Sequence, residues 1–406
     1  MSEIILIRVS GPDKPGIVAA LAETMASYDV RILDIGQAVI HSILSLGMLV
    51  HVPQSAAPVL KDLLFKGNSL GVKMAFEPVS TDDYERWVSQ QGKPRYLVTM
   101  LGKQITSSAL DAVSRTIAGN GLNIDKIARL SGRVSLEHPD ANPYTVVEFT
   151  VRGTPSSSDA LRQAFLEIAQ EHAVDVAFQR DDIYRRNRRL VAFDMDSTLI
   201  QVEVINELAA AAGVGEQVAV ITESAMRGEL DFDASFRKRL SLLKGLDESV
   251  LQEIAARLPL TDGAERLFAI LRSLGFKTAI ISGGFQYFGR YLQEKLAVDY
   301  VMANELEVVD GKVTGEVKGQ IVNGERKAEF LREIAARENI DLRQVIAVGD
   351  GANDLPMIGL AGLGIAFRAK PVVRQGADHA MSVAGLDGIL YLIGVRDRET
   401  LDLLNA

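Results

Sequence analysis

The chain reads Val191-Ala192-Phe193-Asp194-Met195-Asp196-Ser197-Thr198-Leu199-Ile200 where its carboxy-terminal half begins. The first three residues end an apolar run without alternation, which indicates a parallel strand buried on both faces of a sheet. Asp194 and Asp196 come after this strand, at the end where open α/β sheets bind their ligands. Two carboxylates on one loop can act as nucleophile and as proton donor. Because Asp-x-Asp also occurs in ordinary turns, the interpretation depends on residues further along the chain.

Three later segments also place polar residues at a strand end or a helix start. They are Ser282-Gly283-Gly284 after the run 277–281, Lys327 at the start of a predicted helix, and Asp350, Asn353 and Asp354 after the run 344–348. Backbone amides and a hydroxyl at such a turn can bind an anion, and a lysine is a mobile charge suited to a phosphate. Carboxylate oxygens at a strand end suit Mg²⁺. Taken singly, each segment could be a turn, a surface lysine or an Asx-capped loop, but their order along one chain favours a phosphate site.

The region around these segments is predicted to be an α/β domain over residues 188–406. Apolar strands over 190–193, 277–281, 344–348 and 362–366 alternate with helices, which is typical of a parallel sheet covered on both faces. Between 199 and 259 the pattern is helical and interrupts this alternation. We therefore expect a small helical cap over about residues 202–260.

The amino-terminal half contains the same order of predicted elements twice. Strand, helix, two strands, helix and strand succeed one another over 1–80 and again over 93–180, with a period of about 90 residues that indicates an internal duplication. The first unit carries the turn Gly11-Pro12-Asp13-Lys14-Pro15-Gly16, and the second has the shorter turn Gly102-Lys103-Gln104. We expect two small α+β domains, with Thr106 capping a helix of the second.

Polar stretches over 79–95 and 179–189 separate the three segments and are predicted to be connectors, partly helical. The second contains Arg185-Arg186-Asn187-Arg188-Arg189, which we interpret as a solvated lead-in to the next strand rather than a nucleic-acid patch. With 44 Lys and Arg against 53 Asp and Glu, the chain has a net charge of −9. An acidic chain is a poor binder of nucleic acid.

The composition excludes several kinds of chemistry. The chain has 406 residues and no cysteine, so disulfide scaffolds, cysteine-ligated metal sites and thiol nucleophiles are ruled out. The sequence shows neither a signal peptide nor a run of about 18 uncharged apolar residues, which favours a soluble protein without membrane contact. We expect the protein in the cytoplasm.

In their order and spacing, the four segments resemble the four motifs of the haloacid dehalogenase superfamily of phosphotransferases, over Leu190 to about Ala384. The resemblance implies an Mg²⁺-dependent enzyme with a Rossmann-like parallel sheet, in which Asp194 is the nucleophile and Asp196 the general acid and base. It implies metal ligation by Asp194, by the backbone carbonyl of Asp196 and by Asp350, with Asp354 behind them. An acid at position 196 favours a phosphatase or phosphomutase over the pumps of the superfamily, which carry Thr there.

The predicted cap carries residues suited to a small amino-acid ester. Glu203 and Arg239 can hold an ammonium and a carboxylate, and Met226 and Phe232 can exclude water. With the motif residues, this pattern closely resembles the phosphoserine phosphatases of the superfamily. The resemblance implies hydrolysis of O-phospho-L-serine to L-serine, the last step of serine biosynthesis, through an aspartyl-phosphate. It also implies phosphate contacts from Ser282, Gly283, Lys327 and Asn353.

The two βαββαβ units resemble ACT domains, which commonly bind amino acids at paired interfaces. This resemblance implies a homodimer with feedback control by L-serine, and its candidate ligand-binding positions are Gly11, Asp13, Gly16 and Gly102. The units can also be structural modules without a ligand. Two other functions stay open: a phosphotransferase acting on another small amino alcohol, and a non-catalytic amino-acid sensor. The sensor is disfavoured because every motif position is present.

Overall fold

The computed structural model describes residues 2–53, 55–138, 143–227 and 229–404. The chain divides into two compact units, Met1–Lys93 and Pro94–Ala406. The second unit contains both the second βαββαβ segment and the α/β segment of the sequence. Within the described ranges, no helix is at once long enough and apolar enough to cross a membrane.

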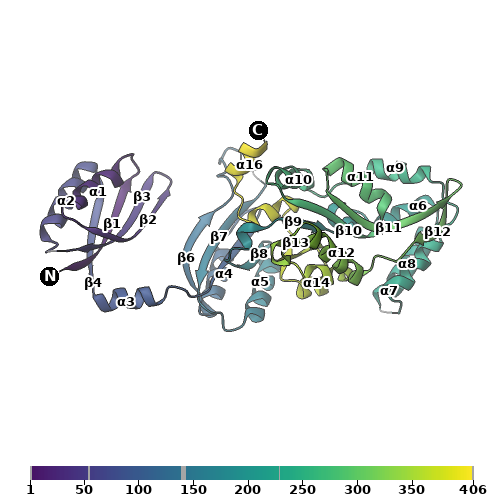
Figure 1. Ribbon diagram of the computed structural model, residues 1–406, viewed down its shortest axis with the longest axis horizontal. Helices are drawn as coiled ribbons and strands as arrows, with labels where there is room; N and C mark the ends of the chain where they lie inside the picture. Colours follow the sequence, from purple (N-terminus) through teal and green to yellow (C-terminus); the bar gives the residue numbers. More distant parts are fainter. Residues whose placement is uncertain (1, 54, 139–142, 228, 405–406) are drawn as a thin grey trace. The chain divides into compact units, whose positions relative to one another are not determined.

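The first unit is a four-stranded antiparallel sheet with two helices packed on one face (Figure 1). Its elements are β1 (Glu3–Pro12), α1 (Ile17–Ala26), β2 (Arg31–Ile40), β3 (Ile43–Val52), α2 (Ala57–Leu70), β4 (Lys73–Val79) and α3 (Thr81–Ser89), with strand order β2-β3-β1-β4. Ile5, Ile7 and Val9 of β1 share one core with Leu21 and Met25 of α1. These spacings of two and of three to four residues are the patterns by which the sequence predicts the elements.

The second unit begins with the same arrangement. Its first elements are β5 (Arg95–Gly102), α4 (Ser107–Gly119), β6 (Asn123–Arg129), β7 (Thr145–Arg152), α5 (Ser158–His172) and β8 (Asp175–Arg180), with strand order β6-β7-β5-β8. The predicted helix cap is confirmed, because the Thr106 hydroxyl accepts a hydrogen bond from the Ala109 amide at 3.2 Å. The repeated βαββαβ fold expected from the sequence is therefore present.

A seven-stranded sheet forms the centre of the second unit. Its strands are β9 (Leu190–Phe193), β10 (Lys277–Phe285), β11 (Tyr300–Val309), β12 (Lys312–Lys318), β13 (Val345–Gly349), β14 (Leu363–Phe367) and β15 (His379–Met381), in the order β12-β11-β10-β9-β13-β14-β15. All neighbours are parallel except β11 and β12, which form an antiparallel pair. The sequence predicts β9, β10, β13 and β14 but misses β11 and β12, which carry many polar residues, and β15, which has only three residues.

Helices pack on both faces of this sheet, and each face has its own core. In β9, Val191 and Phe193 belong to one core, whereas Leu190 and Ala192 belong to the other. The helices are α10 (Ala264–Ser273), α11 (Gln286–Leu296), α12 (Gly324–Arg337), α13 (Leu355–Ile358), α14 (Pro371–Gly376), α15 (Ile389–Leu392) and α16 (Asp397–Leu404). This arrangement confirms the prediction of a parallel sheet buried on both faces.

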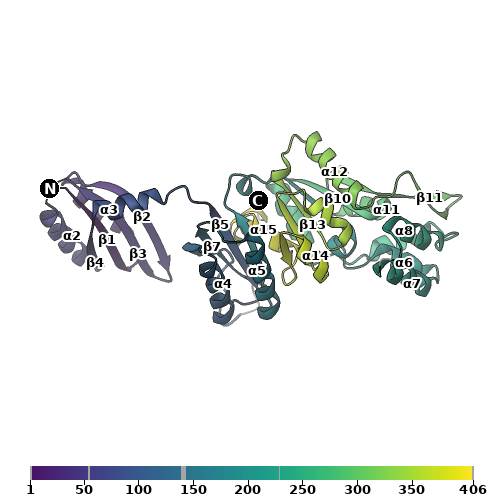
Figure 2. The same cartoon turned by 90° about the horizontal axis from the view of Figure 1, so that it is seen from below.

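Four helices between β9 and α10 form a cap. They are α6 (Val204–Ala211), α7 (Gly215–Met226), α8 (Phe232–Ser241) and α9 (Ser249–Arg257), and they gather at one end of the seven-stranded sheet (Figures 1 and 2). The two segments that connect the cap run side by side. Ile200 pairs with Leu260 in an antiparallel bridge, and the Gln201 amide donates a hydrogen bond to the Pro259 carbonyl at 3.0 Å. The two crossings of the chain into the cap therefore lie side by side, and the segment between α8 and α9 adds a second contact, with the Gly245 amide donating a hydrogen bond to the Val313 carbonyl of β12 at 2.8 Å.

The second βαββαβ segment packs directly against the α/β segment. Leu101 and Val146, on the outer face of its sheet, belong to the same core as Leu390. At the start of β8, the buried Asp175 carboxylate accepts hydrogen bonds from the backbone amides of residues 382–384, at 2.6 to 3.1 Å. Apolar contacts and hydrogen bonds together make one compact unit of the two segments.

Candidate active site

The first functional loop leads directly out of β9. The Asp194 amide donates a hydrogen bond to the Val348 carbonyl of β13 at 2.9 Å, so the strand pairing extends to the first carboxylate. The chain then makes one turn over Met195–Leu199, in which Ser197 takes the left-handed conformation with φ of 56°. Both carboxylates are buried by this turn, since Asp194 is 6% and Asp196 9% exposed.

Parallel strand ends bring the predicted residues together. Because β10, β9 and β13 are neighbours in the sheet, Ser282, Asp194 and Asp350 meet at its carboxyl edge. A pocket at this edge is lined by most of the predicted residues: Asp194, Asp196, Glu203, Phe232, Arg239, Ser282, Gly283, Asp350 and Asn353. Lys327 and Asp354 are fully buried behind Asp194.

The Lys327 ammonium lies between two carboxylates. Its Nζ is 2.8 Å from Oδ1 of Asp194 and 2.6 Å from Oδ1 of Asp354. Burial opposes the charged form of the lysine, but the two acids outweigh burial and raise the pKa of Lys327. Lys327 is therefore a fixed positive charge beside Asp194, which is what binding of a phosphoryl group at Asp194 requires.

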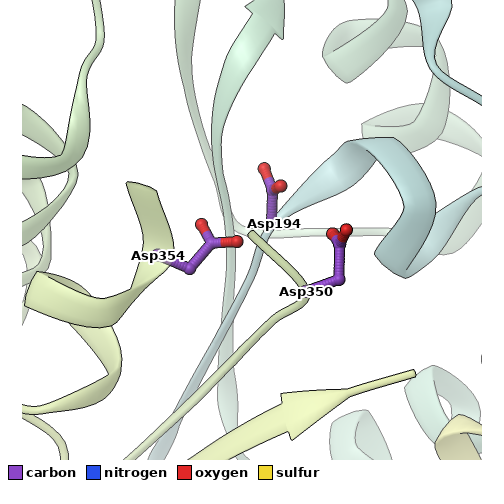
Figure 3. Close-up of side chains that lie close together, drawn as sticks. All are labelled: Asp194, Asp350 and Asp354. Atoms are coloured by element: carbon purple, nitrogen blue, oxygen red, sulfur yellow. The ribbon is translucent and has the colours of Figure 1, made fainter. Parts of the chain in front are cut away.

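The carboxylates of Asp194, Asp350 and Asp354 face a common space (Figure 3). Each offers one oxygen, and these oxygens lie within 4.8 Å of one another. Burial, followed by the charges of Asp194 and Asp354, raises the pKa of Asp350 to about 8. Two buried carboxylates and one half-buried carboxylate that repel one another are a set of hard oxygen donors that fits Mg²⁺, which typically binds one or two protein carboxylates besides water.

Asp196 has different surroundings from Asp194. Its Oδ1 is buried and accepts no hydrogen bond from any described residue. Burial, helped by the charges of Glu203 and Asp194, raises the pKa of Asp196 well above its usual value. A carboxyl group whose pKa is raised binds its proton more tightly and is better suited to act as a general acid. The geometry thus gives the two acids different chemistry, with Asp194 paired to a lysine and Asp196 suited to proton transfer.

The predicted phosphate-binding loop at 282–284 is a bulge that interrupts the pairing of β10 with β11. The Ser282 hydroxyl accepts a hydrogen bond from the Gly284 amide at 3.0 Å, which holds the loop in shape. A Cβ at Gly283 would lie 3.2 Å from Cζ of Phe232, so a larger residue would require the Phe232 ring to shift by a few tenths of an ångström. Bulges of this kind take peptide groups out of the ladder, and the three residues of this one line the pocket.

Two charged side chains of the cap segment line the same pocket. Glu203, just before α6, accepts a hydrogen bond from the Ser197 hydroxyl at 2.8 Å. Arg239 on α8 donates a hydrogen bond to the Ser235 carbonyl at 3.4 Å, and burial lowers the pKa of its guanidinium. The cap segment therefore brings one acid and one cation into the pocket that also contains Ser282 and Gly283.

Some pocket residues differ from the predicted set. Met226 ends α7, but its side chain lies outside the part of the chain that the structure describes. Asn206, Thr222 and Lys370 line the pocket and are missed by the sequence-based prediction. Asn206 is three residues beyond Glu203, which places both on one side of the helix start, and Lys370 comes after β14 at the edge where the other strands end. No pattern distinguishes Thr222 from the other polar residues of α7.

The four candidate ligand positions of the βαββαβ domains lie in two different units. In the first unit, Gly11 lies near the end of β1, Asp13 is exposed, and Gly16 with φ of 90° precedes α1, whose start has no side-chain cap among the described residues. In the second unit, Gly102 ends β5 and Thr106 caps the next helix. The two turns therefore differ in structure as they do in sequence.

Comparison with known proteins assigns these features to a family. Residues 191–359 match the haloacid dehalogenase-like hydrolases, and residues 3–77 and 95–179 each match the ACT domain. A phosphoserine phosphatase of Streptomyces coelicolor is 42% identical over 395 residues, which cover 97% of this chain and 93% of that protein. The chain belongs to the phosphoserine phosphatase family. A phosphoserine phosphatase of Mycobacterium tuberculosis is 41% identical over 394 residues, which cover 96% of this chain and 93% of that protein.

Solved structures agree with membership of the phosphoserine phosphatase family. A probable phosphoserine phosphatase from Vibrio cholerae, in an unliganded form, matches with a TM-score of 0.58 and 34% identity over 78% of this chain and 90% of its own. A haloacid dehalogenase family hydrolase from Salmonella enterica matches with a TM-score of 0.63 and 31% identity over 73% of this chain and 99% of its own. The predicted fold, a haloacid dehalogenase domain after two ACT domains, is confirmed, and the chain is an enzyme of the hydrolase class.

Proposed function

We propose that the protein hydrolyses O-phospho-L-serine to L-serine and inorganic phosphate. One observation carries the proposal: in a single pocket, Asp194 lies 2.8 Å from the Lys327 ammonium, while burial raises the pKa of Asp196 two residues further on. These are a nucleophile, a phosphate-binding charge and a proton donor. Relatives named phosphoserine phosphatase, at 41 and 42% identity, support the choice of substrate.

The proposed reaction has two steps. In the first, a carboxylate oxygen of Asp194 attacks phosphorus as the bond from phosphorus to the serine oxygen breaks, and that oxygen takes the proton of Asp196. Asp194 then carries the phosphoryl group as an aspartyl-phosphate. In the second step, Asp196 takes a proton from a water molecule that attacks phosphorus, the bond to Asp194 breaks, and phosphate leaves. The raised pKa of Asp196 suits it to give the first proton.

Mg²⁺ is the proposed cofactor, held by the carboxylates of Asp194 and Asp350 and by the backbone carbonyl of Asp196. The fit of the donor set supports this choice, since three acids offer oxygens within 4.8 Å of one another. Asp354 is fully buried and bonded to Lys327 at 2.6 Å, which suits a supporting position behind the ligands. When bound, the ion supplies positive charge that offsets the charge of the transferring phosphoryl group.

The cap and the bulge are proposed to select the substrate. Glu203 takes the serine ammonium and Arg239 its carboxylate, for which a guanidinium offers two parallel donors. Met226 and Phe232 exclude water from the site. The phosphoryl oxygens are bound by Ser282, Gly283, Lys327 and Asn353. In support, Glu203 and Arg239 line the same pocket as Asp194.

Phosphate release from a panel of phosphomonoesters, with and without Mg²⁺, tests the activity. We expect O-phospho-L-serine to be preferred and Asp194→Asn to lower its turnover by about 10⁴-fold or more, because the amide is a poor nucleophile. Asp111→Asn is the control, since Asp111 is an exposed acid on α4 whose loss leaves the pocket intact. An Asp194→Asn protein with near-native turnover would contradict the covalent route.

Two alternatives give different results in the same assay. A phosphotransferase would pass the phosphoryl group to an added amino alcohol such as homoserine and release less phosphate. A non-catalytic sensor would release none and yet bind serine. Asp194, Asp196 and Lys327 are all present in the pocket or directly behind it, which favours the hydrolase over the sensor.

Feedback by L-serine at the ACT domains is the proposed regulation, with Gly11, Asp13, Gly16 and Gly102 as contact positions. The start of α1 behind Gly16 carries no side-chain cap among the described residues, and its amides suit the carboxylate of an amino acid. A homodimer is proposed as well, because the edge strand β2 exposes Ile32, Ile35 and Ile40. Sedimentation equilibrium of the full chain measures the mass of the particle in solution. A mass equal to that of a single chain would contradict the proposed dimer.

Calorimetric titration of serine into the full chain tests the regulation. Because serine is also the expected product, the titration uses Arg239→Met, in which the proposed carboxylate contact of the active site is gone. We expect binding heat in this variant and its loss on adding Gly16→Val, since a branched residue is strained at φ of 90°. Absence of heat at millimolar serine would remove the regulatory proposal and leave the catalytic one unchanged.

A further inference from the structure

The phosphate-binding bulge is held by a residue outside the pocket lining. Asn304 lies on β11 and is 2% exposed. Its side-chain amide donates a hydrogen bond to the Gly283 carbonyl at 2.8 Å, and its Oδ1 accepts one from the Val322 amide at 2.9 Å. Turning the side-chain amide over would set donor against donor and acceptor against acceptor, so the two bonds fix its orientation.

The geometry of the bulge explains why such a residue is needed. The pairing of β10 with β11 runs as far as Ile281 with Met302 and resumes at Phe285 with Asn304. Over residues 282–284 the peptide groups of β10 leave the ladder, and a buried peptide group without a partner costs about 1–3 kcal/mol. The Asn304 side chain supplies the donor that the ladder no longer provides.

Asn304 also connects the bulge to the helix of Lys327. Val322 directly precedes Asn323, the residue that caps α12, and Lys327 lies at the start of this helix. One buried side chain therefore fixes both the Gly283 peptide and the beginning of the helix that holds the lysine. Asn304 itself does not line the pocket, so it acts on the substrate site only through the residues it holds.

We propose that Asn304 is a positioning residue for phosphoryl binding, which sets the distance between the bulge at 282–284 and the Lys327 ammonium. The inference rests on the proposed function, because it takes the bulge to bind a phosphoryl group. Hydrogen bonds to phosphoryl oxygens weaken when donors move by a few tenths of an ångström. A loosened bulge thus binds phosphate less tightly although every contact residue is still present.

The test compares phosphate affinity with thermal stability in the full chain. Asn304→Leu removes both hydrogen bonds at similar side-chain volume. The probe is inorganic phosphate, titrated calorimetrically in the presence of Mg²⁺, with KM and kcat for O-phospho-L-serine as a second readout. We expect the Kd for phosphate and the KM each to rise about tenfold, since two buried hydrogen bonds that order the site are lost.

Thr278→Val is the matched control. Thr278 is 3% exposed at the opposite end of β10, and its hydroxyl donates a hydrogen bond to Asp299 at 3.1 Å in the segment before β11. We expect this variant to melt at a lower temperature while its Kd for phosphate stays within about twofold of the wild type. If Asn304→Leu also melts lower but keeps its phosphate Kd, the role of Asn304 is structural only and the proposal is wrong.

Failure of the proposed function and failure of the positioning role give different results. Should Asn304→Leu fail to fold, Asn304→Thr, which keeps a hydroxyl but is too short to bridge both peptides, is judged by the same comparison with Thr278→Val. A wild-type protein that binds no phosphate and hydrolyses no phosphoserine contradicts the proposed function. Wild-type binding that persists unchanged in the Asn304 variants overturns the positioning role alone.

Discussion

The two ACT domains share strand order and register but differ in the outer faces of their sheets. Equivalent positions are identified by the pairing: Ser10 pairs with Ser45 and Lys73, and Leu101 pairs with Val146 and Asp175. The first three are exposed, whereas the second three are buried where the second ACT domain meets the phosphatase domain. One fold thus presents a polar face in the first domain and contributes a layer to a larger core in the second.

The strand sequences already contain this difference. Burial in β1 alternates over residues 5–10, as expected for a sheet with one buried face. In β5 every residue from Leu97 to Gly102 is buried, and the sequence there is almost continuously apolar. The comparison teaches that the outer-face positions, rather than the ACT fold itself, determine whether such a domain packs against a neighbour.

The equivalent outer-face residues Leu101 and Ser10 give the strongest test of this conclusion, because each can be replaced by the other's residue type. We expect Leu101→Ser to lower the free energy of unfolding by about 3 kcal/mol, because it removes a buried apolar side chain and leaves a hydroxyl in its place. Ser10→Leu is the reciprocal control and should change stability by less than about 0.5 kcal/mol. Urea unfolding followed by circular dichroism measures both, and equal effects would show that the two faces are equivalent after all.

Asp175, which lies on the neighbouring strand β8 and pairs with Leu101, should give the second largest loss of stability when it is replaced. Asp175→Ala removes the carboxylate that accepts hydrogen bonds from the amides of residues 382–384, and leaving these amides without their acceptor, the buried Ala384 amide above all, should cost about 2 kcal/mol. The equivalent residue of the first domain, Lys73, is exposed, so Lys73→Ala should cost almost nothing. An Asp175→Ala protein as stable as Lys73→Ala would mean that this junction contributes no stability through its hydrogen bonds.

A smaller, pH-dependent effect is expected at the same junction. His379 on β15 is buried, and burial lowers its pKa to about 4. The negative charge of Asp378 opposes this decrease of the pKa, whereas the positive charges of Arg162 and Arg188 add to it. As the pH falls below about 6.5 the unfolded chain gains a proton at this histidine while the folded chain does not, so stability falls. From pH 7.5 to 5.5 the loss from this group is about 1.4 kcal/mol. His379→Gln should remove it.

The measurement is the free energy of unfolding of wild type and His379→Gln at several pH values. Carboxylates elsewhere titrate in both proteins, so the difference between the two curves isolates the histidine. Curves that stay parallel between pH 7.5 and 5.5 would contradict a buried neutral His379.

The candidate catalytic residues of the phosphatase domain could be predicted from the sequence because one rule brings them to a common edge of the sheet. Asp194, Ser282 and Asp350 each come after an apolar run, and parallel strands bring their carboxyl ends to one edge. The residue that supports them could not be found in this way. Asn304 lies on a strand with many polar residues, and its importance depends on a bulge in a different strand.

The basic run before β9 shows the other limit of sequence reasoning. The interpretation of it as a solvated lead-in is wrong for Arg185, which is buried and ion-paired with Glu148, and for Arg188, which donates hydrogen bonds to the carbonyls of Arg343 and Gly362. These acceptors are far away in the sequence, so no local pattern announces them. Charge runs predict solvation only where the fold brings no acceptor to them.

The pairing of Ile200 with Leu260 has an evolutionary consequence. The chain leaves the sheet and returns to it at almost the same place, so everything between these two residues is one contiguous insertion, whose further pairing with the sheet is the bridge of Asp247 with Lys312 at β12. Such a module can be lengthened, shortened or exchanged, with matching changes at β12, while Asp194 and Lys327 stay where they are. Recognition of a new phosphate ester can therefore arise by replacing one contiguous stretch of gene, without rebuilding the chemistry beneath it.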